Sequence, residues 1–426
     1  MDIRRIARAI PRRPLAILTA GLVAGLVAWA PVLATVSWSA PTVASANGAY
    51  PSEGRSLART VTSGGTVKLH QVYTKYAFNG VAAKDGGPYQ GVYYRRGNST
   101  GTSWGTAKRL NGTTTHAATP AIATAGKYVY AAWRTELHAG AAYDPADARW
   151  LQFRRNVHYG DASEWRPIKN LYVGRIDRPA IAASGSSVYI AYTDSVGGEV
   201  RVVKSSDAGA TFGSAKAIGS TTGLSEGYAG FADIAVSGST VVVAWQSGSG
   251  VLARVSTNGG STWGGAVTMS STPDRFLSVA AAGGRLAVAW SIPSMGGFTR
   301  VWKSGAWAPT RKFQAYTADD ATPKGRELDV VLTGTSRIAV AYTYCLKQGC
   351  ASSDGLDVRW RESNTNGQSW GTVRTVGSHT ASAARRANEA PTALFASSTR
   401  RLVLWTTWSN STPSETTYIK SGSGTP

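Results

Sequence analysis

One short polar turn recurs four times along this chain. Each copy spans eight residues, is rich in Ser, Thr, Asn and Gly, and ends in an aromatic side chain: 97–104 (GNSTGTSW), 205–212 (SSDAGATF), 256–263 (STNGGSTW) and 363–370 (SNTNGQSW). Asp207 and Asn258 can bond backbone amides two residues on, and the glycines can adopt positive φ. Because the repeated unit dictates the architecture of a repeat array, this turn constrains the fold more than any single segment.

The segments around these turns have the period of half-buried strands. Residues 199–204 (EVRVVK) precede one turn and residues 264–269 (GGAVTM) follow another. Upstream of the turns, strands end in a small or apolar residue and an aromatic, at intervals of 45 to 63 residues: Tyr73, Trp133, Tyr192, Trp245, Trp290, Tyr342 and Trp405. Before most of these aromatics two strands meet at a Ser-Gly turn, as in 179–192 and 231–245. Each unit therefore contains four antiparallel strands.

Four-stranded units in series are typical of a β-propeller, an all-β fold in which each unit is one blade. Seven units begin near Ser56, Ala118, Arg178, Gly230, Arg275, Arg326 and Glu389. The sequence favours seven blades in one domain, and six blades is the alternative. The 48 Gly, 15 Trp and 18 Tyr residues suit many turns and aromatic sheets. The last unit ends before a fourth strand, and we expect residues just after Asn47 to supply it and close the ring.

The repeated turn resembles the Asp-box, or bacterial neuraminidase repeat, whose pattern is Ser/Thr-x-Asp-x-Gly-x-Thr-Trp. The copy at 205–212 departs from it only in Phe212, Asn258 replaces the Asp in the second copy, and the other two copies are looser. The resemblance implies that each box lies between the third and fourth strands of a propeller blade, away from the ligand. Structural roles are therefore expected for Ser205, Asp207, Gly209, Thr211, Phe212, Ser256, Asn258, Gly260, Thr262, Trp263, Trp370 and Trp104.

The N-terminus has the pattern of an export signal. Five arginines within the first 13 residues precede an apolar run over 15–36, and Ala44-Ser45-Ala46 offers a small-residue cleavage site. We expect a signal peptide over 1–46 and a propeller over 47–426, secreted or anchored at the cell surface. The apolar run is also long enough to span a bilayer, so an uncleaved membrane anchor remains the alternative. An exported chain with one close cysteine pair predicts a disulfide between Cys345 and Cys350.

The chain is strongly basic, and it lacks the motifs of most enzyme classes. Its net charge is +21, and removal of residues 1–46, with five Arg and one Asp, leaves about +17. Such a charge attracts acidic glycans and other cell-surface polyanions, although it also suits a soluble secreted protein. No Lys/Arg cluster indicates specific nucleic-acid binding, and neither a metal site nor a cofactor motif is present in the sequence. A monomer is expected.

Three arginines lead into the first strands of three of the seven units: Arg178, Arg275 and Arg326. Propeller ligands usually lie over the central channel at this end, and a guanidinium matches a carboxylate through paired donors. This arrangement is similar to that of sialidases, which hold sialic acid with an arginine triad and use a Tyr nucleophile, a Glu and an Asp. The resemblance implies catalytic candidates among Asp177, Glu327, Glu389 and Tyr344, whereas Tyr342 belongs to the repeated core mark. Pairing of these arginines with adjacent carboxylates is the alternative.

The sequence departs from the sialidase pattern in several respects: sialidases have six blades, and the unit that begins at Ala118 has no Arg at the corresponding place. The chain also contains no Phe/Tyr-Arg-Ile-Pro segment, and Arg178 is offset by one residue from Arg275 and Arg326. Three functions remain: an exported sialidase-like glycoside hydrolase, a non-catalytic carbohydrate-binding propeller, and an interaction protein of the cell envelope that uses the ring and its basic surface. All three predict binding of acidic glycans or related polyanions.

Overall fold

Residues 35–426 form one compact unit. The computed structural model describes 36–45, 49–50, 56–75, 91–113, 115–136, 149–174, 176–194, 197–224, 231–272, 276–292, 295–315, 327–345, 356–378, 386–409 and 416–424. Almost all of these residues lie in antiparallel strands or in the turns between them, and one short 3-10 helix covers Ala162–Glu164. No helix among them is long and apolar enough to cross a membrane.

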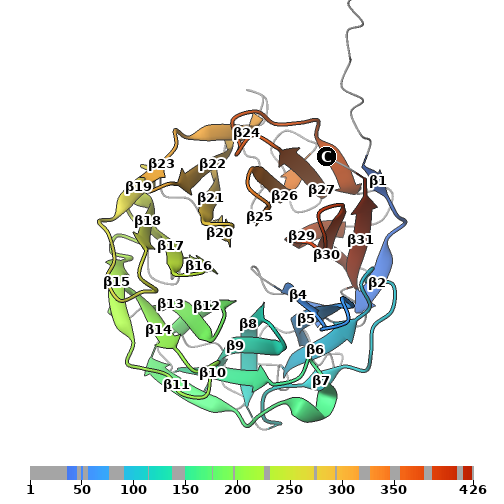
Figure 1. Ribbon diagram of the computed structural model, residues 1–426, viewed down its shortest axis with the longest axis vertical. Coiled ribbons are helices and arrows are strands. Elements are labelled where there is room, and N and C mark those ends of the chain that lie inside the picture. The colour runs from blue at the N-terminus through green and yellow to red at the C-terminus, as the bar shows by residue number, and fades with distance from the viewer. Residues whose placement is uncertain are drawn as a thin grey trace, which may run out of the picture. The chain divides into compact units, whose positions relative to one another are not determined.

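Seven antiparallel sheets follow one another around a common centre, as Figure 1 shows. Blade 1 comprises β3 (Ala49–Tyr50), β4 (Leu57–Val61), β5 (Val67–Lys75), β6 (Gly91–Gly97) and β7 (Lys108–Arg109). Blade 2 comprises β8 (His116–Ala125), β9 (Tyr128–Glu136), β10 (Arg149–Asn156) and β11 (Lys169–Gly174), and blade 3 comprises β12 (Ile176–Ser184), β13 (Ser187–Asp194), β14 (Glu199–Ser205) and β15 (Lys216–Ser220). Blade 4 comprises β16 (Ala232–Ser237), β17 (Thr240–Ser247), β18 (Gly250–Ser256) and β19 (Val267–Ser270).

Blades 5 to 7 complete the ring. Blade 5 comprises β20 (Leu277–Ala282), β21 (Arg285–Ile292), β22 (Gly296–Lys303), β23 (Ala306–Trp307) and β24 (Arg311–Ala315). Blade 6 comprises β25 (Leu328–Thr333), β26 (Arg337–Cys345), β27 (Leu356–Ser363) and β28 (Arg374–Gly377). Blade 7 comprises β29 (Arg386–Phe395), β30 (Arg400–Ser409) and β31 (Thr416–Ser423), together with β1 (Ser37–Trp38) and β2 (Thr42–Ser45). The prediction of seven blades is confirmed. The first strand of each blade faces the centre of the ring (Figure 1).

The ring closes through residues that precede Asn47. Strands β1 and β2 both pair with β31, so the N-terminal segment supplies the outer edge of blade 7. Ala44 is completely buried there, and its carbonyl accepts a hydrogen bond from Arg95 Nη1 at 2.7 Å. The expectation that residues just after Asn47 close the ring is wrong, because β3 pairs with β5 in blade 1 instead. The expected domain start at residue 47 therefore falls after two strands of blade 7.

The hydrophobic core consists of seven clusters of buried side chains that lie mostly between neighbouring blades. The aromatics that mark the ends of the second strands are all buried, as the sequence predicts. Aromatics of the repeated turns pack on the preceding blade: the ring centroid of Phe212 lies 4.8 Å from that of Phe153, and that of Trp370 lies 5.7 Å from that of Phe313. Each turn thus joins two blades as well as two strands.

Side-chain hydrogen bonds order the repeated turns. Ser205 Oγ accepts from the amide of Gly209 at 2.8 Å, and Asp207 Oδ1 accepts from the amide of Thr211 at 2.8 Å. Asn258 accepts from the amide of Thr262 in the same way, at 2.9 Å. These bonds satisfy backbone donors that a tight turn leaves open, which explains the recurrence of short polar side chains. The role of these residues is local and structural.

Basic side chains connect successive blades at the same turns. Arg155 Nη1 donates to the carbonyl of Ala208 at 2.8 Å, and Lys204 Nζ donates to the carbonyl of Gly259 at 2.7 Å. Arg285, which is almost completely buried, donates to Asn366 Oδ1 at 2.6 Å across blades 5 and 6. Part of the large positive charge therefore stabilises the ring rather than serving a ligand.

Candidate functional site

The channel has two distinct ends. We call the end at which the first strands begin the entry end, and the end at which the first strands turn into the second strands the hairpin end. The predicted site residues belong to the entry end. Arg275 and Arg326 lie outside the described residues, as does Cys350; Glu389 lies in β29 and Cys345 in β26, but their side chains are also outside the described part. Asp177, Arg178, Glu327 and Tyr344 can be placed.

Proline interrupts the first strands of three blades at the entry end. The pairing register shifts between Ala118 and Ala121 in β8, between Asp177 and Ala180 in β12, and between Glu389 and Thr392 in β29. Each shift contains an X-Pro pair, and proline has no amide hydrogen to donate to the ladder. Arg178 has a positive φ of 39° at this bulge. Such bulges redirect side chains, so this one sets the direction of Arg178.

Asp177 and Arg178, although adjacent, contact different blades. Asp177 forms an ion pair with Arg134 of β9 in blade 2. The guanidinium of Arg178 lies over the ring of Phe231, 4.0 Å from its centroid, and that ring lies 5.1 Å from the ring of Phe276. Phe231 and Phe276 immediately precede the first strands of blades 4 and 5. We call Arg178, Phe231 and Phe276, all half-buried, the entry platform.

The candidate residues of blade 6 lie at the same end. The guanidinium of Arg359 covers the ring of Tyr344, 3.5 Å from its centroid, and Arg359 Nη2 lies 3.9 Å from Asp357 Oδ2. The backbone of Glu327 bonds to Thr343, whose amide donates to the Glu327 carbonyl at 3.0 Å. Asp177 and Tyr344 thus each contact an arginine.

A cluster of charged residues and tyrosine at the junction of blades 2 and 3 was missed by the sequence analysis. Tyr172 Oη donates to Asp194 Oδ2 at 2.7 Å, and Arg201 Nη2 lies 2.6 Å from Glu199 Oε2. The hydrogen bond to Asp194, together with burial, raises the pKa of Tyr172. Glu199 and Arg201 lie two apart on one strand, so their shared face was readable from the sequence. Tyr172 and Asp194 come from other strands, so their presence in this cluster was not readable from the sequence.

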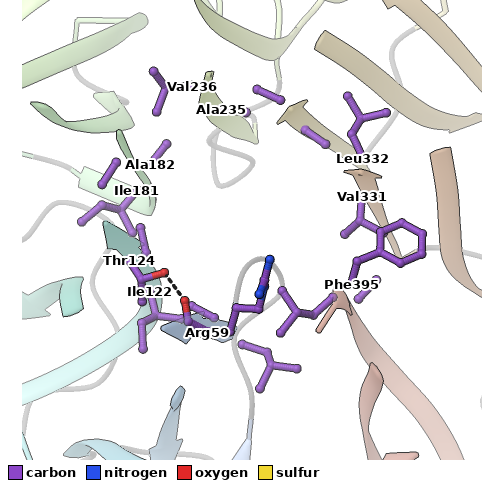
Figure 2. A pocket seen from close by; sticks show the side chains of 18 of the residues that line it. Arg59, Ile122, Thr124, Ile181, Ala182, Ala235, Val236, Val331, Leu332 and Phe395 are labelled. Atoms are coloured by element: carbon purple, nitrogen blue, oxygen red, sulfur yellow. Dashed lines mark hydrogen bonds between the residues drawn. The ribbon is translucent and has the colours of Figure 1, made fainter. Parts of the chain in front are cut away.

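A cavity of about 510 Å³ occupies the hairpin half of the channel. The first strands of all seven blades contribute to its wall, and Figure 2 shows its side chains arranged around the opening. Most of the lining residues are aliphatic, and the labelled ones include Ile122, Ile181, Val331 and Leu332. Arg59 extends into this space from β4 (Figure 2). The sequence analysis did not single out Arg59.

Comparisons with known proteins bear on the fold. No protein-family model matches this chain, and no curated protein matches it. Among solved structures, the chain is similar to the Hadza microbial sialidase Hz136, with 14% identity over 68% of this chain and 63% of that one and a TM-score of 0.42. A leech intramolecular trans-sialidase has 10% identity over 72% of this chain and 67% of that one, with a TM-score of 0.47.

A third similar structure is a protein of unknown function from Dyadobacter fermentans, with 14% identity over 74% of this chain and 96% of that one and a TM-score of 0.45. This chain spans 63% of the length of the Hadza sialidase that it matches. At these identities and TM-scores the comparisons carry no statement about this chain's activity.

Proposed function

We propose that this protein is exported and binds acidic glycans at the entry end of its channel. The observation that carries the proposal is the entry platform, in which Arg178 lies 4.0 Å from the ring centroid of Phe231 and Phe276 extends the aromatic surface. Sites for small ligands combine aromatic walls with a few convergent polar groups, and a guanidinium pairs well with a sugar-acid carboxylate. The net charge of +21 attracts polyanionic glycans to the same surface.

Binding is a better proposal than hydrolysis for the described residues. A glycosidase of the sialidase type needs a carboxylate able to exchange protons and a tyrosine able to attack. Asp177 is held in an ion pair with Arg134, and both side chains are largely buried. That pairing gives Asp177 a structural role between blades 2 and 3, which disfavours a catalytic role. We therefore propose a carbohydrate-binding propeller as the primary function.

A glycan array tests the binding proposal. The wild-type protein is expected to retain sialylated or uronic-acid glycans and to discriminate among them. Arg178→Ala is expected to weaken that binding about tenfold or more, since a charge-assisted hydrogen bond contributes roughly 1.5–3 kcal/mol. Arg311→Ala, on the exposed outer strand β24, is the matched control for loss of one positive charge and is expected to bind normally. Binding that ignores sugar identity and disappears at moderate salt would instead support a charge-only envelope role.

Hydrolysis is the second candidate because of Tyr344. The guanidinium of Arg359 lies over its ring, 3.5 Å from the centroid, and tyrosine is among the side chains that act as covalent nucleophiles. Incubation with a fluorogenic sialoside tests this candidate directly. Release by the wild-type protein and its loss in Tyr344→Phe would establish sialidase action, whereas no release above buffer rejects it and leaves the binding proposal intact.

A further inference from the structure

Arg59 lies in a cavity whose lining side chains are mostly aliphatic. Among the residues that line the cavity it is the only basic one, and Asp329 is the only acidic one. Its backbone carbonyl accepts a hydrogen bond from Thr124 Oγ1 at 2.6 Å, which fixes β4 against β8. Within the described part of the chain, its guanidinium forms neither a hydrogen bond nor an ion pair. Figure 2 shows the guanidinium extending toward the middle of the opening.

Both carboxylate oxygens of Asp329 accept hydrogen bonds from neighbouring first strands. Ser278 Oγ donates to Asp329 Oδ1 at 2.8 Å, and the amide of Ala393 donates to Asp329 Oδ2 at 2.8 Å. Asp329 is 4% exposed, and these bonds connect the first strands of blades 5, 6 and 7. This carboxylate therefore acts as a structural acceptor between blades.

The surroundings of Arg59 disfavour an uncompensated charge. Burial lowers the pKa of the guanidinium from its ordinary value. Arginine nevertheless stays protonated in proteins, so the charge persists and its five donors require acceptors. Water can satisfy them in the free protein, and an anion would do so with the added gain of charge pairing.

We infer that the hairpin half of the channel binds a small monocarboxylate with an apolar body. The carboxylate would pair with the guanidinium of Arg59, and the apolar body would contact the aliphatic wall and Phe395. A single cation balances a single negative charge, and the mostly aliphatic side chains of the lining suit an apolar body. The cavity volume of about 510 Å³ lies within the range of small-molecule sites.

This site is separate from the entry platform in location and chemistry. None of the three entry-platform residues lines the cavity, and the lining side chains are mostly aliphatic, with hydroxyls from Thr60, Thr124 and Thr333. The inference does not depend on the proposed glycan binding, and either can fail without the other.

Titration calorimetry with hexanoate, up to about 10 mM, tests the inference. We expect saturable binding to the wild-type protein and binding of hexanamide, the uncharged analogue, that is weaker by about tenfold or more. Arg59→Gln, which keeps the length and polarity of the side chain, is expected to reduce hexanoate affinity by a similar factor without changing hexanamide binding. Arg311→Ala and Arg178→Ala are expected to bind hexanoate as the wild type does.

Three results would overturn the inference: no hexanoate binding to the wild-type protein, equal affinity for acid and amide, or unchanged hexanoate affinity in Arg59→Gln. Each variant is first shown to be folded by its circular dichroism spectrum and melting curve. If Arg59→Gln does not fold, Arg59→Lys serves in its place. Lysine retains the charge but not the paired donors, so it is expected to bind hexanoate more weakly than arginine and still to prefer it over hexanamide.

Discussion

Arg401 Nε lies 2.8 Å from Glu362 Oε2 and joins blade 7 to blade 6. Arg401 is completely buried, and Arg337 binds the other carboxylate oxygen of Glu362. Burial by itself would raise the pKa of Glu362, but the hydrogen bonds and charges of the two arginines outweigh it and lower the pKa below its ordinary value. One carboxylate therefore pairs with two arginines where the last two blades meet.

Replacement of Glu362 by Gln is expected to destabilise the protein strongly. Loss of the anion leaves Arg401 and Arg337 without their shared counter-charge, and breaking such a buried pair typically costs about 3–5 kcal/mol. Urea denaturation followed by tryptophan fluorescence measures the change. Glu164→Gln, at a half-exposed site, is the control and should stay within about 0.5 kcal/mol of wild type. Equal midpoints for Glu362→Gln and wild type would contradict the interpretation.

Acid is expected to weaken the protein through His70. This histidine is completely buried, and its Nε2 lies 2.8 Å from Thr60 Oγ1 and its Nδ1 2.7 Å from Tyr94 Oη. Tyr94 donates its hydroxyl hydrogen to the Gly160 carbonyl, so the network suits a neutral imidazole that donates through Nδ1. Burial and then the charge of Arg96 lower the pKa of His70 to about 3.

The sign of the His70 effect follows from linkage. The unfolded chain binds a proton at His70 below pH of about 6.5 and the folded chain does not, so stability falls as pH drops between about 6.5 and about 3. The maximal slope from this one group is about 1.4 kcal/mol per pH unit. Urea midpoints across this range measure it, and His70→Gln is expected to flatten the slope. An unchanged slope in the variant would assign the acid sensitivity to other groups.

Truncation at residue 47 is expected to open blade 7. The chain 47–426 lacks β1 and β2, so β31 loses its outer partner and the ring of Trp38 no longer packs 5.9 Å from that of Trp360. We expect a melting temperature at least about 5 °C below that of 36–426, and self-association through the exposed strand edge. Differential scanning fluorimetry and size-exclusion chromatography measure both. Identical behaviour of the two chains would refute a stabilising role for this segment.

Asp329→Ala is expected to loosen three blades at once. The substitution leaves the buried amide of Ala393 and the hydroxyl of Ser278 without the carboxylate that now accepts from both. An unsatisfied buried donor costs roughly 1–3 kcal/mol, so the loss should exceed 1 kcal/mol. Ser249→Ala, at an exposed turn position, is the control. Hydrogen exchange of β20, β25 and β29 should accelerate in Asp329→Ala, and unchanged exchange there would argue against this bracing.

The sequence predicts the blades well because their signals are local. Turn residues such as Asp207 bond amides a few positions away, and strand alternation depends only on neighbours in the chain. The starts of the seven units were therefore predicted to within a few residues. The pairing of β1 and β2 with β31 escaped prediction because it joins residues nearly 400 positions apart. The strand pattern at 37–45 is short and lies next to the apparent cleavage site, so the sequence favoured a signal peptide that includes this segment.

The candidate sites depended even more on long-range contacts. The sequence placed Arg178 at the start of a first strand, but the choice of Phe231 as its contact is made by packing between blades 3 and 4. Arg59 has no distinguishing local pattern, and its isolation appears only when seven first strands surround it. Glycan binding, hydrolysis and the disulfide between Cys345 and Cys350 stay predictions.

The sequence by itself determined the repeating unit and the residues that make each turn, and it favoured seven blades over six, because hydrogen bonding within a turn and alternation along a strand need only near neighbours. Only the tertiary structure decided which segment closes the ring, which carboxylate neutralises which arginine, and which cation stands alone in the channel. These outcomes depend on how seven similar sheets pack against one another, and electrostatic and packing energies between residues far apart in the chain leave no local mark on the sequence.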